Sequence, residues 1–328
     1  MSTTPARRWI DRWNAYWFPA TPIRHLAICR IVAVGAQLIW FFPDLEEHRN
    51  LLRKNPEFIE PQLIIRAISA IVPRDLFFTP DAFTLLYWVT AIAGISALVG
   101  FYTRTSLLVF ALGTWIFVSH LFSYGDRHHT EAVFAIFLML LVIAPSGESL
   151  SVDALIRRRR GAADPVSSRT AQSEMAVWPL KVAHVLLAMT YFSAGMSKML
   201  FSGLRWMNGY TLQGHTLGDA LERGHPVGIW LAQQHTLAVA LSVFTILLEL
   251  FFFLSLFLPR LAPLFFLGAL GFQVGLYVTA GYDFFQHMVL LTLLLFFLYP
   301  AWWQTWLARR HLTGTPRLRG EEAAAQPR

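Results

Sequence analysis

The stretch PLKVAHVLLAMTYFSAGMSKML, residues 179–200, decides the fold class because it is long and apolar enough to cross a bilayer as one helix. A transmembrane helix needs about 20 predominantly apolar residues, and several other windows of the chain approach that length. The whole chain agrees, since 55% of its 328 residues are hydrophobic, 14% are charged and the mean hydropathy is +0.47. We therefore predict an all-α, polytopic integral membrane bundle.

The apolar windows predict about eight transmembrane helices, at residues 24–43, 82–102, 105–122, 130–145, 179–200, 236–258, 261–280 and 285–303. With both termini in the cytoplasm, most Lys and Arg residues lie on the inner side, as the positive-inside rule requires. The net charge of +7 then reflects topology and contact with membrane lipid, and we expect no nucleic-acid partner. We expect a multi-pass protein of a bacterial inner or plasma membrane.

This topology divides the chain into three parts. Residues 1–23 form a basic, aromatic segment, either a helix in the membrane interface or a plain cytoplasmic tail. Residues 24–303 form the transmembrane domain, and residues 304–328 form a basic cytoplasmic tail. Inside the domain, residues 157–178 are expected to be a flexible cytoplasmic linker, and residues 201–235 an outer loop that packs over the helix mouths.

Lys198 is a cation at the outer end of the 179–200 span. A lysine there either snorkels to water or is kept dry, and desolvation disfavours its ammonium form. A neutral amine beside a cavity serves as a general base or as a Schiff-base nucleophile. Tyr191 and His184 share its helical stripe, but His184 lies about 21 Å from Lys198 along the axis and cannot share its site. Ala188 and Gly195 lie near the same stripe and allow a close helix approach.

Most of the histidines are predicted on or near the outer face, where titratable groups would converge on a cavity: His48, His120, His128, His129, His215, His225, His235 and His287. The alternative is that these are ordinary polar residues of loops and helix ends. Asp283 and His287 are spaced i, i+4 and would share a face if the last helix has begun. The GDRHHTE segment, residues 125–131, contains His128 and His129 but no metal-binding spacing, so we predict no metal.

Two further charges, Arg30 and Glu249, lie deep in apolar spans. Each would cost at least about 2.5 kcal/mol near the bilayer centre without a partner. Their opposite signs suggest that they pair with each other, in a structural role.

Three segments carry a family resemblance: CRIVAVG at residues 29–35, HHTEAVFAIFLMLLVIAPSGESLSVDAL from residue 128, and YFSAGMSKMLFSGLRWMNGYTLQ from residue 191. Together they resemble the HTTM (horizontally transferred transmembrane) family, the membrane core shared with vitamin K-dependent gamma-glutamyl carboxylase. The third is the most specific, with its Tyr-Phe-x-Ala-Gly run, the following lysine and Gly-Tyr. The similarity covers residues 24–303.

The resemblance implies that Lys198 is the base that supports oxygenation of reduced vitamin K or another quinol. O2 and CO2 would be co-substrates, with a glutamate side chain as the group carboxylated. The family histidine at the outer start of the middle span matches His129, with His128 as a rival. Substrate-binding residues around Lys198 would be Tyr191, Asn208, Tyr210, Asp283 and His287.

Two departures from the carboxylase change these expectations. Asn208 stands where an acidic residue is expected, and no counterpart of the carboxylase's large extracytoplasmic domain follows residue 303. We therefore expect a quinol-binding or quinol-oxygenating core, or a maturation factor for a small exported peptide or protein. The competing class is a non-enzymatic membrane component, either a partner-binding subunit or a transporter-like protein.

Overall fold

The computed structural model describes residues 5–53, 59–73, 77–125, 129–161 and 172–300. In the first half of the chain its elements are α1 (Pro5–Trp17), β1 (Thr21–Pro22), α2 (Ile23–Trp40), α3 (Leu45–Leu52), α4 (Leu63–Ile68), α5 (Pro80–Val99), α6 (Thr103–Ser123), α7 (His129–Ile143) and α8 (Val152–Arg159). In the second half they are β2 (Gln172–Ser173), α9 (Trp178–Ser202), η3 (Gly203–Asn208), α10 (Tyr210–Arg223), α11 (Pro226–Ala232), α12 (His235–Phe251), η4 (Phe252–Leu256), α13 (Ala262–Ala280) and α14 (Phe285–Leu298).

The predicted all-α membrane bundle is confirmed, and each predicted span overlaps one of the main helices. Among the described residues, six helical segments are long and apolar enough to cross a membrane: Ile23–Trp40, Pro80–Val99, Thr103–Ser123, Trp178–Asn208, His235–Leu256 and Ala262–Ala280. Two apolar helices are shorter, α7 and α14. The chain is therefore a multi-pass membrane protein, while the prediction of eight crossings and of cytoplasmic termini stays a prediction.

Helix α5 shows where lipid contacts the bundle. Its exposed side chains recur every three or four residues and are large and apolar: Leu85, Trp88, Ile92, Ile95 and Val99. The opposite stripe, with Phe83, Thr90, Ala93, Gly94 and Ala97, is buried. Since such an apolar stripe is unfavourable in water, it indicates contact with acyl chains.

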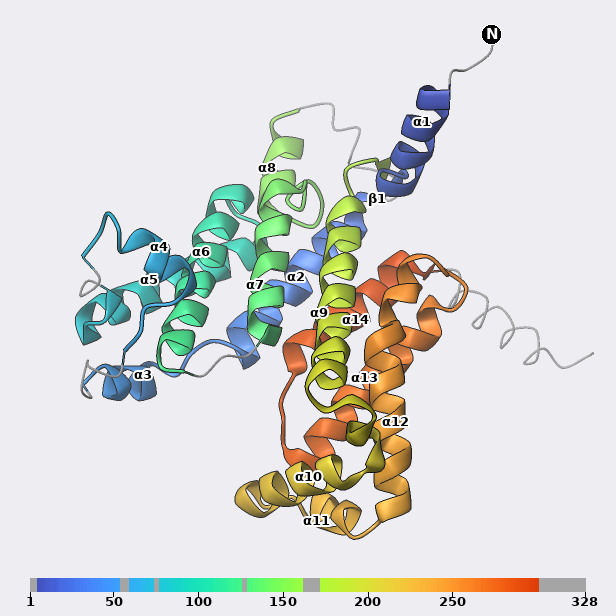
Figure 1. The fold of residues 1–328 in the computed structure, drawn as a ribbon. Coiled ribbons are helices and arrows are strands. Elements are labelled where there is room, and N and C mark those ends of the chain that lie inside the picture. Colours follow the sequence, from blue (N-terminus) through green and yellow to red (C-terminus); the bar gives the residue numbers. More distant parts are fainter. Residues whose placement is uncertain (1–4, 54–58, 74–76, 126–128, 162–171, 301–328) are drawn as a thin grey trace, which may run out of the picture.

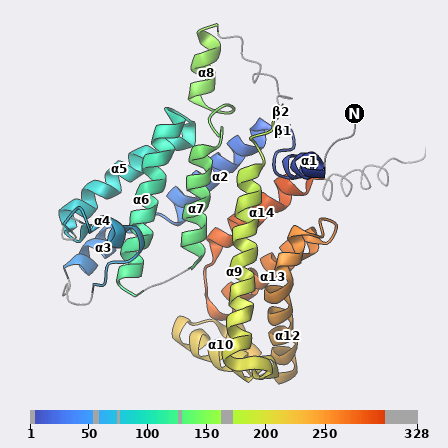
Figure 2. The same ribbon diagram turned by 45° about the horizontal axis from the view of Figure 1, so that its top comes forward.

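The two halves of the chain meet through four helices in the middle of the bundle. Helices α2 and α7 of the first half pack against α14, and α7 also packs against α9. Helices α5 and α6 lie on one flank, and α12 and α13 on the other (Figures 1 and 2). One apolar core runs through both halves. Helices α1 and α8 lie at one end of the molecule, and α10 and α11 at the opposite end.

Arg30 on α2 is fully buried, and its partners are backbone carbonyls. Its guanidinium donates to the carbonyl oxygens of Ser146, at 2.9 Å, and Leu150, at 2.6 Å, both in the turn between α7 and α8. The expected pairing of Arg30 with Glu249 is therefore wrong, because the forked guanidinium is held by this turn and Glu249 has another partner. The expected structural role for Arg30 agrees with these contacts.

Asp153, near the start of α8, holds the turn between α5 and α6. Its carboxylate accepts hydrogen bonds from the backbone N–H groups of Tyr102 and Thr103 and from the Thr103 hydroxyl, at 2.7–2.9 Å. Burial favours the neutral carboxyl, but these hydrogen bonds and the nearby Arg157 outweigh burial and lower the pKa of Asp153. The carboxylate thus caps the N-terminus of α6.

The ends of the predicted 157–178 linker have secondary structure. Helix α8 continues to Arg159, and β2 pairs antiparallel with β1 next to the N-terminal helix α1. The Lys181 ammonium on α9 donates to the Tyr16 carbonyl of α1. Residues 162–171 and the predicted tail 304–328 lie outside the described residues.

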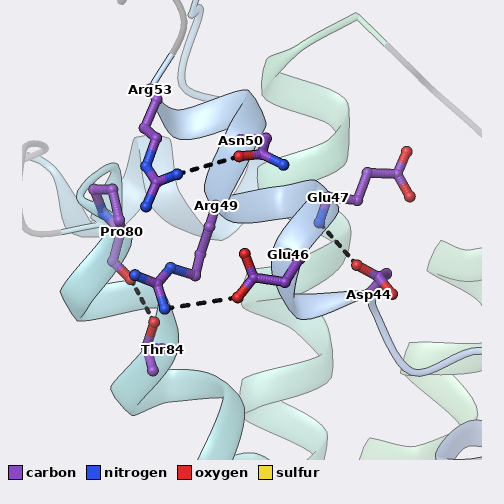
Figure 3. Close-up of polar contacts among 8 residues, drawn as sticks. All are labelled: Asp44, Glu46, Glu47, Arg49, Asn50, Arg53, Pro80 and Thr84. Carbon is purple, nitrogen blue, oxygen red and sulfur yellow. Dashed lines mark hydrogen bonds and ion pairs between the residues drawn. The ribbon is translucent and has the colours of Figure 1, made fainter.

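Helix α3 is short, and the polar contacts on its exposed side are local (Figure 3). The Glu47 N–H donates to Asp44 Oδ1 at 2.8 Å, which caps the first turn, and Arg49 lies 3.9 Å from Glu46. On α5, the Thr84 hydroxyl donates back to the Pro80 carbonyl. Ion pairs on such an exposed surface contribute little to stability, so these polar contacts do not determine how α3 packs.

The Arg30 fork generates a stability prediction. Arg30→Lys keeps the charge but loses the planar fork that reaches both carbonyls, and an unsatisfied buried carbonyl costs about 1–3 kcal/mol. We expect a lower thermal unfolding midpoint in detergent, measured by intrinsic fluorescence. Arg24→Lys, on the exposed face of the same helix, is the matched control and should leave the midpoint unchanged. Equal midpoints for the two variants would contradict a structural role for Arg30.

Candidate active site

A cavity of about 330 Å³ opens among α9, α10, α12, α13 and the start of α14. Apolar residues form much of its wall, including Leu212, Phe272, Leu276 and Phe284. Its polar and charged lining residues come from elements far apart in the sequence: Thr190, Tyr191, Lys198, Trp206, His215, Asp219, Thr245, Glu249, Gln273, Tyr282 and His287. A mainly apolar pocket with a few convergent polar groups is typical of a small-molecule site.

Lys198 and Glu249 form an ion pair in this cavity. The Lys198 ammonium lies 2.8 Å from each Glu249 carboxylate oxygen. The Glu249 side chain is 4% exposed and that of Lys198 is 25% exposed, so the carboxylate is enclosed while the amine still reaches open space. The Trp206 ring lies 5.4 Å from the ammonium and adds a cation–π contact. Each charge of the pair thus compensates the other at the wall of the cavity.

Gly195 explains how the two helices that carry this pair approach each other. A Cβ atom at Gly195 would lie 2.9 Å from Glu249 Cβ and 3.0 Å from the Leu250 nitrogen. The predicted close approach at this position is therefore confirmed, and it brings the α12 backbone beside α9 one turn from Lys198.

Tyr191 and Gln273 form a second polar group in the cavity wall. The Gln273 Nε2 donates to the Tyr191 hydroxyl oxygen at 2.8 Å, and both side chains are buried. The Tyr191 ring stacks on Phe252 with centroids 4.6 Å apart, which fixes its orientation. His287, also buried, lies on its other side with ring centroids 6.2 Å apart.

The mouth of the cavity is formed by α10 and the segment before α14. His215 and Asp219 are one turn apart on α10, and both line the cavity. Burial, together with the neighbouring Asp219 carboxylate, raises the pKa of Tyr282. The Arg223 guanidinium lies 4.8 Å from the centroid of the Tyr282 ring. The segment predicted as the outer loop 201–235 is thus helical, and it supplies part of the wall.

The HTTM domain model matches residues 18–302. The chain belongs to the HTTM family. No curated protein and no solved structure matches the chain. The match includes every lining residue of the cavity, so the cavity lies within the matched domain of this chain.

Several predicted site residues meet in the cavity of this HTTM protein. Lys198, Tyr191 and His287 all line it, together with Glu249, which was expected to be a structural charge paired elsewhere. His184 does not, as predicted from its spacing. It lies near the start of α9, where its Nε2 is 2.7 Å from the Ser255 hydroxyl of η4.

Three other predicted residues do not line the cavity. Asp283 is exposed and precedes α14, which begins at Phe285, so the expected i, i+4 pair with His287 is wrong. Asn208 accepts a hydrogen bond from the Tyr210 N–H at 3.0 Å and so supports the start of α10. The Tyr210 side chain points outward, 67% exposed, and its ring packs on His235.

The catalytic role of His128 or His129 in the GDRHHTE segment stays a prediction. His128 lies outside the described residues, and for His129 the structure describes only the backbone, at the start of α7. Within the described part of the chain, no three His, Cys, Asp or Glu residues gather as metal ligands would.

The outer histidines do not all converge, contrary to expectation. His48 and His120 lie between α3, α5 and α6, with ring centroids 5.8 Å apart and each 5.1 Å from Phe83. Burial lowers the pKa of His48 and keeps its ring neutral. This cluster belongs to the packing of the first half.

Sequence reasoning placed His215 among the outer histidines but missed Gln273 and Asp219 as cavity residues. Gln273 carried a usable signal, because it is the one amide in the apolar 261–280 window, and a buried amide in a membrane helix needs a partner. No comparable signal distinguished Asp219 from other polar residues of α10.

The close contact at Gly195 leads to a packing prediction. Gly195→Ala places a Cβ atom against Glu249 Cβ and the Leu250 nitrogen of α12. Such overpacking costs about 1–3 kcal/mol. We expect a lower thermal unfolding midpoint. Gly271→Ala on α13 is the control, since its Cβ would meet nothing within 4 Å and Ala favours a helix by about 1 kcal/mol. A Gly195→Ala midpoint as high as that of the control would refute the close approach.

The ion pair leads to a second prediction, on additivity. Lys198→Met leaves the buried Glu249 carboxylate uncompensated, whereas adding Glu249→Gln removes that charge as well. The double variant should therefore be more stable than the sum of the single losses predicts, by about 1–3 kcal/mol. Chemical denaturation of the four proteins measures this coupling. Strict additivity would mean that the two groups do not interact.

Proposed function

We propose that the cavity binds the aromatic head of a quinol and that the Lys198–Glu249 pair accepts a hydroxyl proton from it. The supporting observation is the ion pair itself, which puts a proton acceptor at the wall of a mainly apolar cavity. The volume of about 330 Å³ is in the range of small-molecule sites, and Phe272, Leu276 and Phe284 offer apolar surface to a ring. The residues present thus fit an aromatic alcohol.

The pair can take up this proton without creating net charge. Lys198 begins as an ammonium and Glu249 as a carboxylate. Lys198 passes its proton to Glu249 across a 2.8 Å hydrogen bond, and the resulting amine takes the hydroxyl proton. Glu249 is then neutral, and the Lys198 ammonium lies beside the deprotonated oxygen. Because the summed charge of the site is constant, a low dielectric opposes this transfer less than it opposes ionisation of a lone group.

The later chemistry follows from the family. The HTTM family is linked to vitamin K-dependent carboxylase-like membrane proteins. In the carboxylase, a bound quinol supplies electrons to O2 and the strong base that removes a glutamate gamma proton before CO2 adds. We propose reduced vitamin K or a related quinol as the partner of this cavity. Carboxylation of a glutamate in a small exported peptide is the further step that the resemblance suggests.

The charge distribution supports an outward-facing cavity. The cavity lies toward the α10–α11 end, whereas Arg157, Arg158 and Arg159 of α8 and the basic residues of α1 lie at the opposite end (Figure 1). Since Lys and Arg concentrate on the cytoplasmic side, we place the cavity mouth on the outer side.

The proposal predicts the effect of removing either member of the pair. Purified protein given a reduced naphthoquinone and O2 should form quinone epoxide, and Lys198→Ala and Glu249→Gln should each lower the rate about 100-fold or more. Lys181→Ala is the matched control, because it makes the same change at the other end of α9, about 25 Å away. Labelled bicarbonate with a glutamate-containing peptide tests carboxylation in the same samples.

Folded wild-type protein that neither binds quinol nor forms epoxide would refute the proposal. The non-enzymatic class would then stand, and it predicts that Lys198→Ala leaves the cellular phenotype intact.

A further inference from the structure

The Tyr191–Gln273 pair has hydrogen-bonding capacity that the protein does not use. Gln273 is 4% exposed and lines the cavity, and its Oε1 has no hydrogen-bond partner among the described residues. Tyr191, also 4% exposed, accepts from Gln273 through its hydroxyl oxygen, and no described residue accepts the hydroxyl proton. A buried amide oxygen without a donor is unusual, because desolvating it is costly. These two atoms offer one acceptor and one donor to a bound molecule.

This second polar group lies away from the ion pair. Tyr191 precedes Lys198 by two helical turns on the same stripe of α9, which separates their backbones by about 10 Å. Gln273 approaches from α13, and apolar side chains of the cavity wall, among them Phe272 and Leu276, come from the same helix. The cavity therefore offers hydrogen-bonding groups at two places, with apolar surface beside them. A flat apolar ring with an oxygen at each end matches this distribution.

We propose that Tyr191 and Gln273 bind the second hydroxyl of the quinol, across the ring from the Lys198–Glu249 pair, and so select 1,4-dihydroxy aromatics over mono-hydroxy ones. This inference rests on the proposed function. The second hydroxyl donates to Gln273 Oε1 and accepts from the Tyr191 hydroxyl. Gln273 is thus a specificity residue that orients the ring so that a single oxygen faces Lys198.

The physical basis of the selection is the unpaired amide. A mono-ether of the quinol can still accept from Tyr191 but cannot donate to Gln273, so the amide oxygen stays buried without a partner. Sites built to hydrogen-bond a substrate hydroxyl discriminate strongly against analogues that lack it. We expect the full-length protein to bind the diol about 10–100-fold more tightly than its mono-ether.

The test is anaerobic calorimetric titration of the purified full-length protein with 1,4-naphthoquinol and with 4-methoxy-1-naphthol. Wild type should prefer the diol, and Gln273→Leu should reduce this preference to about onefold, because no amide is then left unpaired in the mono-ether complex. Gln37→Leu is the matched control, because Gln37 is also buried in a membrane helix but lies outside the cavity. Its preference should equal that of wild type. If Gln273→Leu does not fold, Gln273→Met, which keeps the side-chain length, replaces it.

The outcomes separate this inference from the proposed function. Wild type that binds both ligands equally, or a preference that persists in Gln273→Leu, overturns the role of Gln273 and leaves quinol binding intact. A loss of preference in Gln37→Leu equal to that in Gln273→Leu also overturns it. Wild type that binds neither ligand overturns the proposed function, and the inference falls with it.

Discussion

The ion pair between Lys198 and Glu249 is the interaction on which the site depends. An apolar bundle tolerates a buried carboxylate only when an opposite charge or several donors compensate it. Here one ammonium contacts both oxygens of Glu249, and Gly195 allows the two helices close enough for that geometry. The cavity then opens on the lysine side of the pair, where the side chain is a quarter exposed. Charge compensation and access to a ligand thus meet at one amine.

Arg30 shows the contrasting solution to the same problem. Its guanidinium is fully buried and is held by the carbonyls of Ser146 and Leu150 in the turn between α7 and α8. Polar partners offset the cost of burying each cation, but the Arg30 guanidinium is fully enclosed and has a structural role. Only Lys198 has a partner that can exchange a proton with it, and it adjoins a cavity. Burial alone therefore does not distinguish a functional charge in this membrane protein.

Much of the fold could be predicted from the sequence, because long apolar runs leave few alternatives in a bilayer. The stripe that joins Tyr191 to Lys198 and the exclusion of His184 also followed from helix geometry. Partners across helices could not be predicted, since opposite sign and similar depth do not fix which helices are neighbours, and Glu249 was assigned to the wrong cation. The expected pair of Asp283 with His287 failed because the turn at Gly281 delays α14 until Phe285. Such details depend on tertiary packing.

The central claim is that Glu249 takes the proton of the Lys198 ammonium when the Lys198 amine accepts a proton from the quinol. Infrared difference spectroscopy of the full-length protein, recorded anaerobically with and without a naphthoquinol, reports this protonation directly. The account predicts a new band of a protonated carboxyl group on quinol binding, shifted by deuterium oxide and lost in Glu249→Gln. Quinol binding without that band, or with the same band in Glu249→Gln, would contradict it.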